Sequence, residues 1–307
     1  MKGIELAKAF YEEYGIPMLK EFPELQGKIA IGLVGSGSDC FGFDDEFSKD
    51  HDFEPAFCLF LPDEAQVDRR SAFLLERAYA KLPKEYMGYA RNALDPVGGN
   101  RHGVLRMEEF FRSKTGTPDG DLTVDAWFAV PEFSLAEATN GAVFRDDLGA
   151  FTAIREKLSK FPRDVRLKKL AGELLLMAQA GQYNYSRCIA RGETAAARLA
   201  AFEFAKSALH AIFLLNDTYL PFYKWQFRAL RGLPKLCDLV QPLEQLLSSA
   251  GAENAEWIEQ IVGAVLDETR AQGLSDLPHN EAELHAYAVN GQIADGNLRN
   301  QHILYGI

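Results

Sequence analysis

The chain has 307 residues, of which 47% are hydrophobic and 25% are charged, a composition typical of globular proteins that excludes disordered and collagen-like chains. Aspartate and glutamate outnumber lysine and arginine by 44 to 33, and the resulting net charge of −11 argues against broad, salt-driven nucleic-acid binding. No stretch reaches the roughly 18 consecutive apolar residues of a membrane span, and the first residues lack a signal peptide's apolar core, so we expect a cytoplasmic protein without a membrane partner.

The N-terminal part combines helix and strand patterns. Apolar residues at helical spacing predict a helix from Ile4 that breaks near Gly15 and Pro17. Short apolar segments predict buried strands, and longer segments with an apolar stripe predict helices between them. The expected strands are residues 28–34, 57–61 and 103–107, the expected helices are 65–82 and 108–114, and residues 86–100 are expected to be irregular.

Helical periods dominate from about residue 134 onward. The expected helices are residues 148–161, 165–180, 186–215, 223–230, 239–249 and 255–272, and no pattern is assigned to residues 279–280 or 297–307. The sequence therefore predicts an α/β protein of the α+β type. Its N-terminal domain, residues 1–140, would be a mixed sheet with flanking helices, and residues 141–307 would form an all-helical bundle.

The candidate chemistry lies between the first two expected strands. Gly35 and Ser36 follow the first strand, and their small size leaves backbone N–H groups and a hydroxyl free to hold phosphate oxygens; Ser38 in the same turn joins this set. Asp50 and Asp52 are expected at the start of the next strand, where residues two apart point to one side. Two carboxylates at one point favour Mg²⁺ or Mn²⁺, which prefer oxygen ligands. The alternative is a plain hairpin turn and two aspartates that flank an exposed turn.

This arrangement of apolar strand, Gly35-Ser36 and Asp50-x-Asp52 resembles the polymerase β-like nucleotidyltransferase superfamily. The gap of 13 residues between the motifs is long for that pattern, and an acidic loop at residues 44–46 accounts for the length. Three later stretches are similar to a bacterial branch of the superfamily that has a helical C-terminal domain and unknown function. These stretches are residues 139–146, 182–184 and 221–225.

The resemblance implies transfer of a nucleoside monophosphate from a nucleoside triphosphate, with ATP the expected donor, to an acceptor hydroxyl and with release of pyrophosphate. Asp50 and Asp52 would be the metal ligands, and Gly35 and Ser36 would hold the terminal phosphates. A small molecule or a protein is favoured over nucleic acid as the acceptor, because the chain is acidic.

The helical half supplies further candidates. Lys224 lies in an aromatic stretch and would neutralise the triphosphate, unless it only extends over an apolar surface. Tyr183 and Arg187 either line the site or cap and pack the helix that opens near Ser186.

Many members of the superfamily use a third carboxylate on a later strand as a metal ligand or general base. The candidates here are Glu108, Glu109 and Asp125, with Glu108 preferred because it follows the expected strand at residues 103–107. Arg112 and Lys114 either meet phosphate or lie at the surface, and the surface is preferred. If none of the three carboxylates reaches the site, the chain is a nucleotide-binding regulator without transfer activity. A further alternative is an interaction protein of the toxin–antitoxin type.

Overall fold

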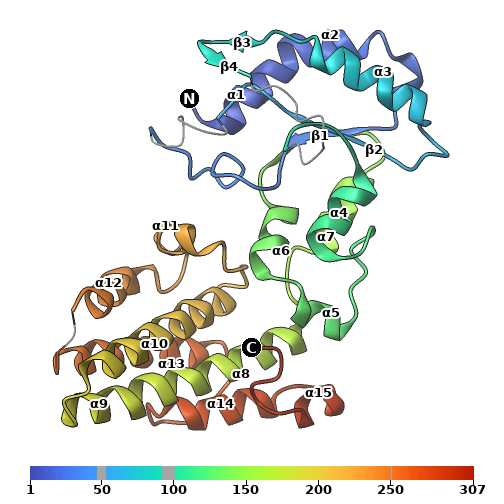
Figure 1. The fold of residues 1–307 in the computed structure, drawn as a ribbon. Helices are drawn as coiled ribbons and strands as arrows, with labels where there is room; N and C mark the ends of the chain where they lie inside the picture. The colour runs from blue at the N-terminus through green and yellow to red at the C-terminus, as the bar shows by residue number, and fades with distance from the viewer. Residues whose placement is uncertain (47–52, 92–100, 250) are drawn as a thin grey trace. The chain divides into compact units, whose positions relative to one another are not determined.

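The structure, a computed structural model, describes residues 1–46, 53–91, 101–249 and 251–307. The chain forms two compact units, the first of residues 1–123 and 133–159 and the second of residues 124–132 and 160–307. The expected fold class is confirmed: the first unit holds a mixed four-stranded sheet with flanking helices, and helices build the second (Figure 1). Residue 140, the expected domain boundary, lies inside the first unit, because the strand that follows it joins the sheet.

The first unit contains short helices and six strands in its described part. Its helices are α1 (Gly3–Phe10), α2 (Ile16–Leu19), α3 (Arg69–Ala80), α4 (Met107–Thr115), α6 (Glu132–Thr139) and α7 (Ala150–Lys157), with the π-helix η1 (Tyr11–Gly15) and the 3-10 helix η2 (Pro23–Leu25). The main sheet contains β1 (Ala30–Leu33), β2 (Cys58–Leu61), β5 (Gly103–Arg106) and β6 (Ala142–Asp146). A small hairpin of β3 (Glu85–Tyr86) and β4 (Tyr89–Ala90) lies where an irregular segment is expected, and both residues of its turn, Met87 and Gly88, are left-handed.

The order of strands in the sheet is β5-β2-β1-β6. β1 pairs antiparallel with β2 and with β6, and β2 pairs parallel with β5. Gly32 lies opposite Cys58, Cys58 lies opposite Gly103, and Leu33 lies opposite Ala142. The residues that follow β1 therefore meet the residues that precede β2, β5 and β6 at one end of the sheet.

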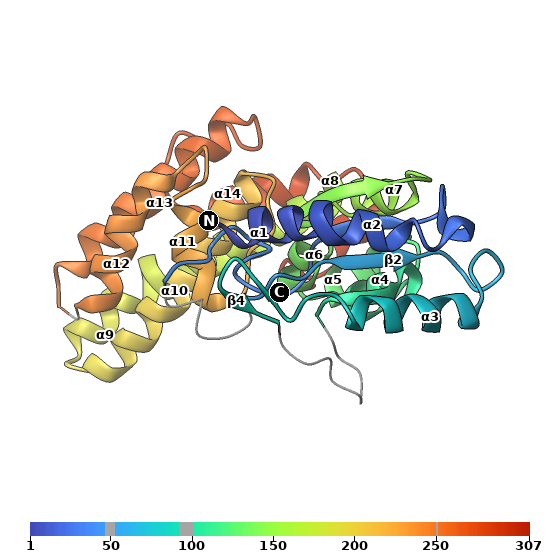
Figure 2. The ribbon, with the colours of Figure 1, turned by 90° about the horizontal axis from the view of Figure 1, so that it is seen from above.

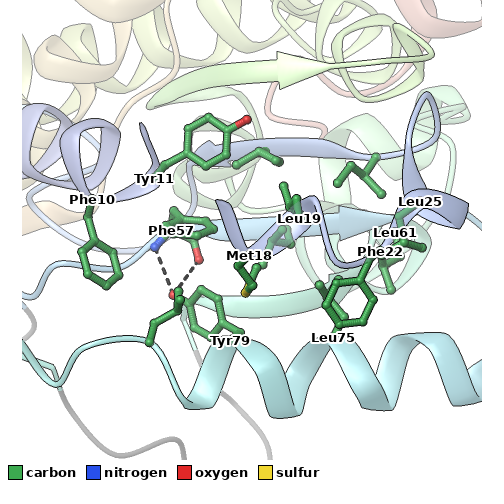
Figure 3. Packing of buried hydrophobic residues seen from close by; sticks show 14 of the residues in the cluster. Phe10, Tyr11, Met18, Leu19, Phe22, Leu25, Phe57, Leu61, Leu75 and Tyr79 are labelled. Carbon is green, nitrogen blue, oxygen red and sulfur yellow. Dashed lines mark hydrogen bonds between the residues drawn. The ribbon is translucent and has the colours of Figure 1, made fainter. Parts of the chain in front are cut away.

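One face of the sheet is covered by α1, α2 and α3, as Figure 1 and Figure 2 show. Ile31, Leu59 and Leu61 point into a buried cluster with residues of these helices (Figure 3). Within the cluster, the Tyr79 hydroxyl accepts the Phe57 N–H at 3.1 Å and donates to the Phe57 carbonyl at 2.9 Å. The buried hydroxyl thus satisfies both backbone groups just before β2, which holds α3 in register with the sheet.

The other face of the sheet is covered by α4 and α7. Phe60 of β2 stacks on Phe151 of α7 with ring centroids 4.2 Å apart, and it contacts Phe110 of α4 edge-on at 5.1 Å. Because alternate residues of β2 point to opposite faces, its wholly apolar sequence fits a strand with helices on both sides. These contacts place α4 beside the end of the sheet where the strand termini meet.

The second unit is built around two long helices, α8 and α10. Its helices are α5 (Val124–Ala129), α8 (Arg163–Met177), η4 (Ala178–Tyr185), α9 (Ser186–Ala190), α10 (Thr194–Leu215), η5 (Tyr223–Trp225), α11 (Gln226–Leu230), η6 (Cys237–Leu239), α12 (Val240–Ser248), α13 (Asn254–Ala271), α14 (Ala282–Gly291) and α15 (Gly296–Asn300). α8 packs against both α10 and α14. Among the described ranges, we find no helix with the length and apolar character of a membrane span.

Candidate functional site

The turn after β1 is the centre of the candidate site. Gly35 and Gly37 have φ angles of +110° and +121°, a backbone region that residues with a Cβ rarely adopt. The two glycines therefore let the chain reverse tightly on both sides of Ser36. The buried strand β1 holds the start of this turn at the end of the sheet.

Asn140, which is distant from the turn in the sequence, holds it by hydrogen bonds. Its Nδ2 donates to the Gly35 carbonyl at 2.8 Å, and its Oδ1 accepts the Gly35 N–H at 2.9 Å. Arg155 of α7 in turn donates to the carbonyls of Thr139 and Asn140 at 2.6 Å each. Both backbone groups of Gly35 are thus satisfied by one side chain, 105 residues later in the sequence.

Ser36, Lys114 and Glu137 form a polar group that we name the Ser36 cluster. The Ser36 hydroxyl donates to Glu137 Oε2 at 2.8 Å and accepts from Lys114 Nζ at 2.9 Å. Lys114 Nζ also contacts Glu137 Oε2 directly at 2.5 Å. The lysine and glutamate side chains are 18% and 15% exposed, so the expected surface position of Lys114 is wrong. The aliphatic stem of Lys114 comes from α4, which packs on the sheet beside the turn.

Arg101 holds the other side of the turn. Its Nε donates to the Ser36 carbonyl at 2.9 Å, and its Nη2 donates to Asp39 Oδ1 at 2.8 Å. A Cβ atom at Gly37 would lie 1.9 Å from Arg101 Nη2. Glycine at this position is therefore required for the guanidinium to approach the turn.

A cavity of about 430 Å³ adjoins the turn and lies within the first unit. The turn contributes Gly35 and Ser36 to its wall. The charged residues of the wall are Arg101, Arg106, Lys114, Glu76 and Glu109. The wall thus combines a glycine turn with three cations, which suits phosphate oxygens.

His102 also lines this cavity, immediately before β5. Its Nδ1 lies 2.8 Å from Glu54 Oε1, and the His102 side chain is 4% exposed. Its Nε2 is buried and has no hydrogen-bond partner among the residues that the structure describes. Sequence reasoning missed this pair, and the sequence offers no pattern that joins positions 54 and 102.

The predicted phosphate-binding residues lie in the turn, but not all of them reach the cavity. Gly35 and Ser36 line it. Ser38 is half-buried in the same turn, and its carbonyl accepts the Phe43 N–H at 2.8 Å, which closes the loop that follows. The predicted metal ligands Asp50 and Asp52 lie outside the described residues. Within the described ranges, no group of three or more His, Cys, Asp or Glu residues could hold a metal ion.

The three candidates for the third carboxylate are separated. Glu108 lies on the exposed face of α4, where its Oε2 is 3.9 Å from Arg112 Nη2. Glu109, the next residue, lines the cavity. Asp125 belongs to the second unit and accepts a hydrogen bond from the Tyr305 hydroxyl at 2.7 Å. The structure therefore favours Glu109 over Glu108, because α4 turns successive side chains by about 100°.

The remaining predicted residues, Tyr183, Arg187 and Lys224, belong to the second unit. The Arg187 guanidinium lies 3.5 Å from the centroid of the Tyr183 ring. Lys224 Nζ lies 5.1 Å from the Trp225 ring centroid. Tyr183 is 55% exposed, so this aromatic pair lies at the surface of the helical unit. Both contacts are cation–π pairs.

A second polar group lies in the helical unit, and we name Glu132, Lys169, Glu173 and His210 the His210 cluster. His210 Nε2 is 2.5 Å from Glu132 Oε1, and His210 Nδ1 is 2.7 Å from Glu173 Oε1. Lys169 Nζ is 3.2 Å from Glu132 Oε1. All four side chains are at most 14% exposed. Each ring nitrogen of His210 thus has a carboxylate partner.

The charges of this cluster shift the pKa values of its members. Burial alone would lower the pKa of His210, but Glu132 and Glu173 outweigh burial and raise it from 6.5 to about 9. Burial alone would raise the pKa of Glu132, but His210 and Lys169 lower it from 4.5 to about 2. The cluster is therefore a set of buried ion pairs at neutral pH.

Comparison with protein families gives one match. Residues 127–226, about a third of the chain, match a family model described as a domain of unknown function, DUF4037. The matched segment includes Glu137 and Asn140, which hold the Gly35–Ser36 turn, and the three later stretches of the resemblance. Searches of curated proteins and of solved structures find no match.

Proposed function

We propose that the protein is a metal-dependent nucleotidyltransferase that passes a nucleoside monophosphate from a nucleoside triphosphate, with ATP as the expected donor, to a hydroxyl of a small molecule or protein. One observation carries this proposal. The Gly35–Ser36 turn lines a cavity with three cations, at the end of the sheet where β2 begins. In the sequence, β2 is preceded by Asp50 and Asp52.

The size and charge of the cavity support a nucleotide ligand. Its volume of about 430 Å³ falls in the range of small-molecule sites. The wall carries Arg101, Arg106 and Lys114 beside two carboxylates, so cations outnumber anions in it although the net charge of the chain is −11. A triphosphate carries several negative charges, and the three cations of the wall are the groups that can pair with them.

The donor set of the expected metal site also fits. Asp50 and Asp52 would hold Mg²⁺ or Mn²⁺, since both ions take carboxylate oxygens. Glu54 follows Asp52 by two residues in the sequence and contacts His102 at the wall of the cavity. When bound, the ion would neutralise phosphate charge.

Glu109 is the residue that we assign to proton removal. In the transfer, the acceptor oxygen bonds to the α-phosphorus, the bond from that phosphorus to the bridging oxygen breaks, and pyrophosphate leaves with the electron pair. The proton of the acceptor hydroxyl goes to the Glu109 carboxylate, which is exposed at the cavity. His102 Nε2 is buried, so the carboxylate is the more accessible acceptor.

A second candidate function, nucleotide binding without transfer, is favoured by the position of Glu109 on a helix. The resemblance implies a third carboxylate on a strand, and the described residues of β5, Gly103–Arg106, contain none. The two functions share the nucleotide site and differ only in turnover.

A thermal-shift experiment tests nucleotide binding. The four ribonucleoside triphosphates are added with and without Mg²⁺ to the wild type, to Asp52→Asn and to the control Asp276→Asn, which changes an exposed aspartate. A ligand at 100 times its Kd stabilises by about 2.7 kcal/mol, a shift of several degrees. We expect an Mg²⁺-dependent shift that Asp52→Asn loses and Asp276→Asn keeps. An equal shift in all three proteins would contradict the site.

Turnover separates the two candidate functions. We expect pyrophosphate release from Mg²⁺–ATP with glycerol as the hydroxyl acceptor, and a loss of about 100-fold or more in Glu109→Gln. Glu108→Gln is the matched control, because it removes the same charge from the exposed face of the same helix. Nucleotide binding without pyrophosphate release in the wild type would favour the regulator. Equal rates in both variants would rule out Glu109 as the base.

A further inference from the structure

In the Ser36 cluster, a carboxylate holds two donors that the proposed function needs for a phosphate. Glu137 Oε2 accepts the Ser36 hydroxyl and contacts the Lys114 ammonium, at 2.8 Å and 2.5 Å. Ser36 and Lys114 line the cavity. The donors that point at Glu137 are the hydroxyl and the ammonium, the two donor types that hold terminal phosphate oxygens.

We propose that Ser36 and Lys114 form the terminal-phosphate subsite of the nucleotide, and that Glu137 occupies this subsite as an internal anion until a triphosphate displaces it. The inference rests on the proposed function and names its phosphate ligands. It assigns to Lys114 the charge-neutralising role that the sequence suggested for Lys224.

Hydrogen-bond capacity requires the displacement. A serine hydroxyl has one hydrogen to donate, so Ser36 donates either to Glu137 or to a phosphate oxygen. Lys114 has three N–H donors, and it can therefore contact a phosphate while it keeps its bond to Ser36 Oγ. When a phosphate takes the Ser36 hydrogen, the Glu137 carboxylate is left without that bond.

Charge repulsion acts in the same direction. A phosphate at Ser36 would lie close to the Glu137 carboxylate. The Glu137 side chain is only 15% exposed, so water screens its charge weakly. Like charges at such distances repel more strongly than in bulk water. The glutamate thus weakens triphosphate binding, and it keeps Lys114 paired when the site is empty.

The turn is held by a residue other than Glu137. Asn140, which follows α6, holds the backbone of Gly35 by two hydrogen bonds from its side chain. The Glu137 side chain can change rotamer without breaking those bonds, because they belong to a different residue. The turn therefore keeps its shape when the carboxylate leaves.

The experiment measures the Kd of Mg²⁺–ATP, inorganic triphosphate and AMP by isothermal titration calorimetry for the wild type, Lys114→Met, Glu137→Gln and the double variant. We expect ATP and triphosphate to bind about tenfold or more weakly to Lys114→Met, since a charge-assisted bond is lost. We expect both ligands to bind at least about threefold more tightly to Glu137→Gln. AMP, which lacks terminal phosphates, should bind equally to all proteins.

An exposed ion pair of the same unit supplies the matched controls. Lys157 and Asp121 lie 2.8 Å apart with side chains 49% and 68% exposed. Lys157→Met and Asp121→Asn change the net charge by the same amounts as the test variants, and we expect no change in any Kd. Unfolding in urea checks each fold, and the double variant keeps the Ser36 cluster neutral if a single change unfolds the protein.

The outcomes distinguish a failure of the proposed function from a failure of the phosphate subsite or of the role of Glu137. A wild type that binds neither ATP nor triphosphate contradicts the proposed function itself. A wild type that binds ATP, together with unchanged binding in Lys114→Met, overturns the phosphate subsite. Weaker or equal ATP binding in Glu137→Gln overturns the internal anion.

Discussion

The Ser36 cluster and the His210 cluster contain similar groups in different settings. Both join a lysine to a glutamate from α6, Glu137 in one and Glu132 in the other. The Ser36 cluster adjoins a cavity and rests on a glycine turn. The His210 cluster satisfies both nitrogens of its central ring with carboxylates. The shifted pKa values of Glu132 and His210 thus belong to a cluster of buried ion pairs. The candidate ligand site is instead identified by the cavity beside the Ser36 cluster.

The largest effect on the free energy of unfolding is expected for His210→Ala. The change leaves Glu132 and Glu173 as buried carboxylates that have lost their shared cation, which typically costs about 3–5 kcal/mol of unfolding free energy. Urea unfolding of the variant measures the loss. His279→Ala is the control, since that side chain is exposed, and it should unfold like the wild type. A loss below about 1 kcal/mol in His210→Ala would show that the cluster does not hold the helical unit together.

The pH dependence of stability gives a second test of the His210 cluster. The raised pKa of His210 adds stability that is complete below pH 6.5 and is lost as the pH rises through about 9. The lowered pKa of Glu132 adds stability that is complete above pH 4.5 and is lost as the pH falls through about 2. The difference in unfolding free energy between the wild type and His210→Ala should therefore be largest between pH 4.5 and 6.5. A difference that grows above pH 9 would contradict the ion pairs.

The smallest effect on stability is expected at the glycine turn. Gly37→Ala adds a Cβ at a φ of +121° and displaces Arg101, at a cost of roughly 1–2 kcal/mol in strain. Gly42→Ala is the matched control, because its φ of +67° is also left-handed while no atom lies within 4 Å of the added Cβ. Urea unfolding should show a larger loss in Gly37→Ala than in Gly42→Ala, because only the first variant displaces Arg101. Only Gly37→Ala should weaken ATP binding, as measured by calorimetry, and equal binding would remove Arg101 from the site.

The buried strands and helices of the first unit could be predicted because their apolar patterns are local. The wholly apolar strand β2 and the short helix α4 lie where the sequence places them. β6 was missed as a strand, since all five of its residues are half-buried and show no apolar alternation. α14 was missed because its buried face includes alanines and a histidine, which give a weak helical stripe.

The candidate site could be predicted only in part. The Gly35–Ser36 turn carries a local signal, because glycines beside a buried strand indicate a tight turn. Glu137 and Asn140 contact this turn from more than 100 residues away, and no spacing rule connects them to it. For Lys114 the sequence leaves a phosphate contact open and favours the surface, because a lysine is mostly exposed, whereas its partners Ser36 and Glu137 stabilise it in a half-buried position.

The division of the chain between the two units has a consequence for synthesis. The chain leaves the first unit after residue 123, returns at 133 and leaves it again after 159. During translation, the second edge of β1 therefore stays unpaired until residues 142–146 have been made. Residues 124–132 can pack in their own unit only after the helices beyond residue 160 have been made. A single cut or an early stop between these crossings removes part of one unit, so neither unit can be exchanged as a continuous gene segment.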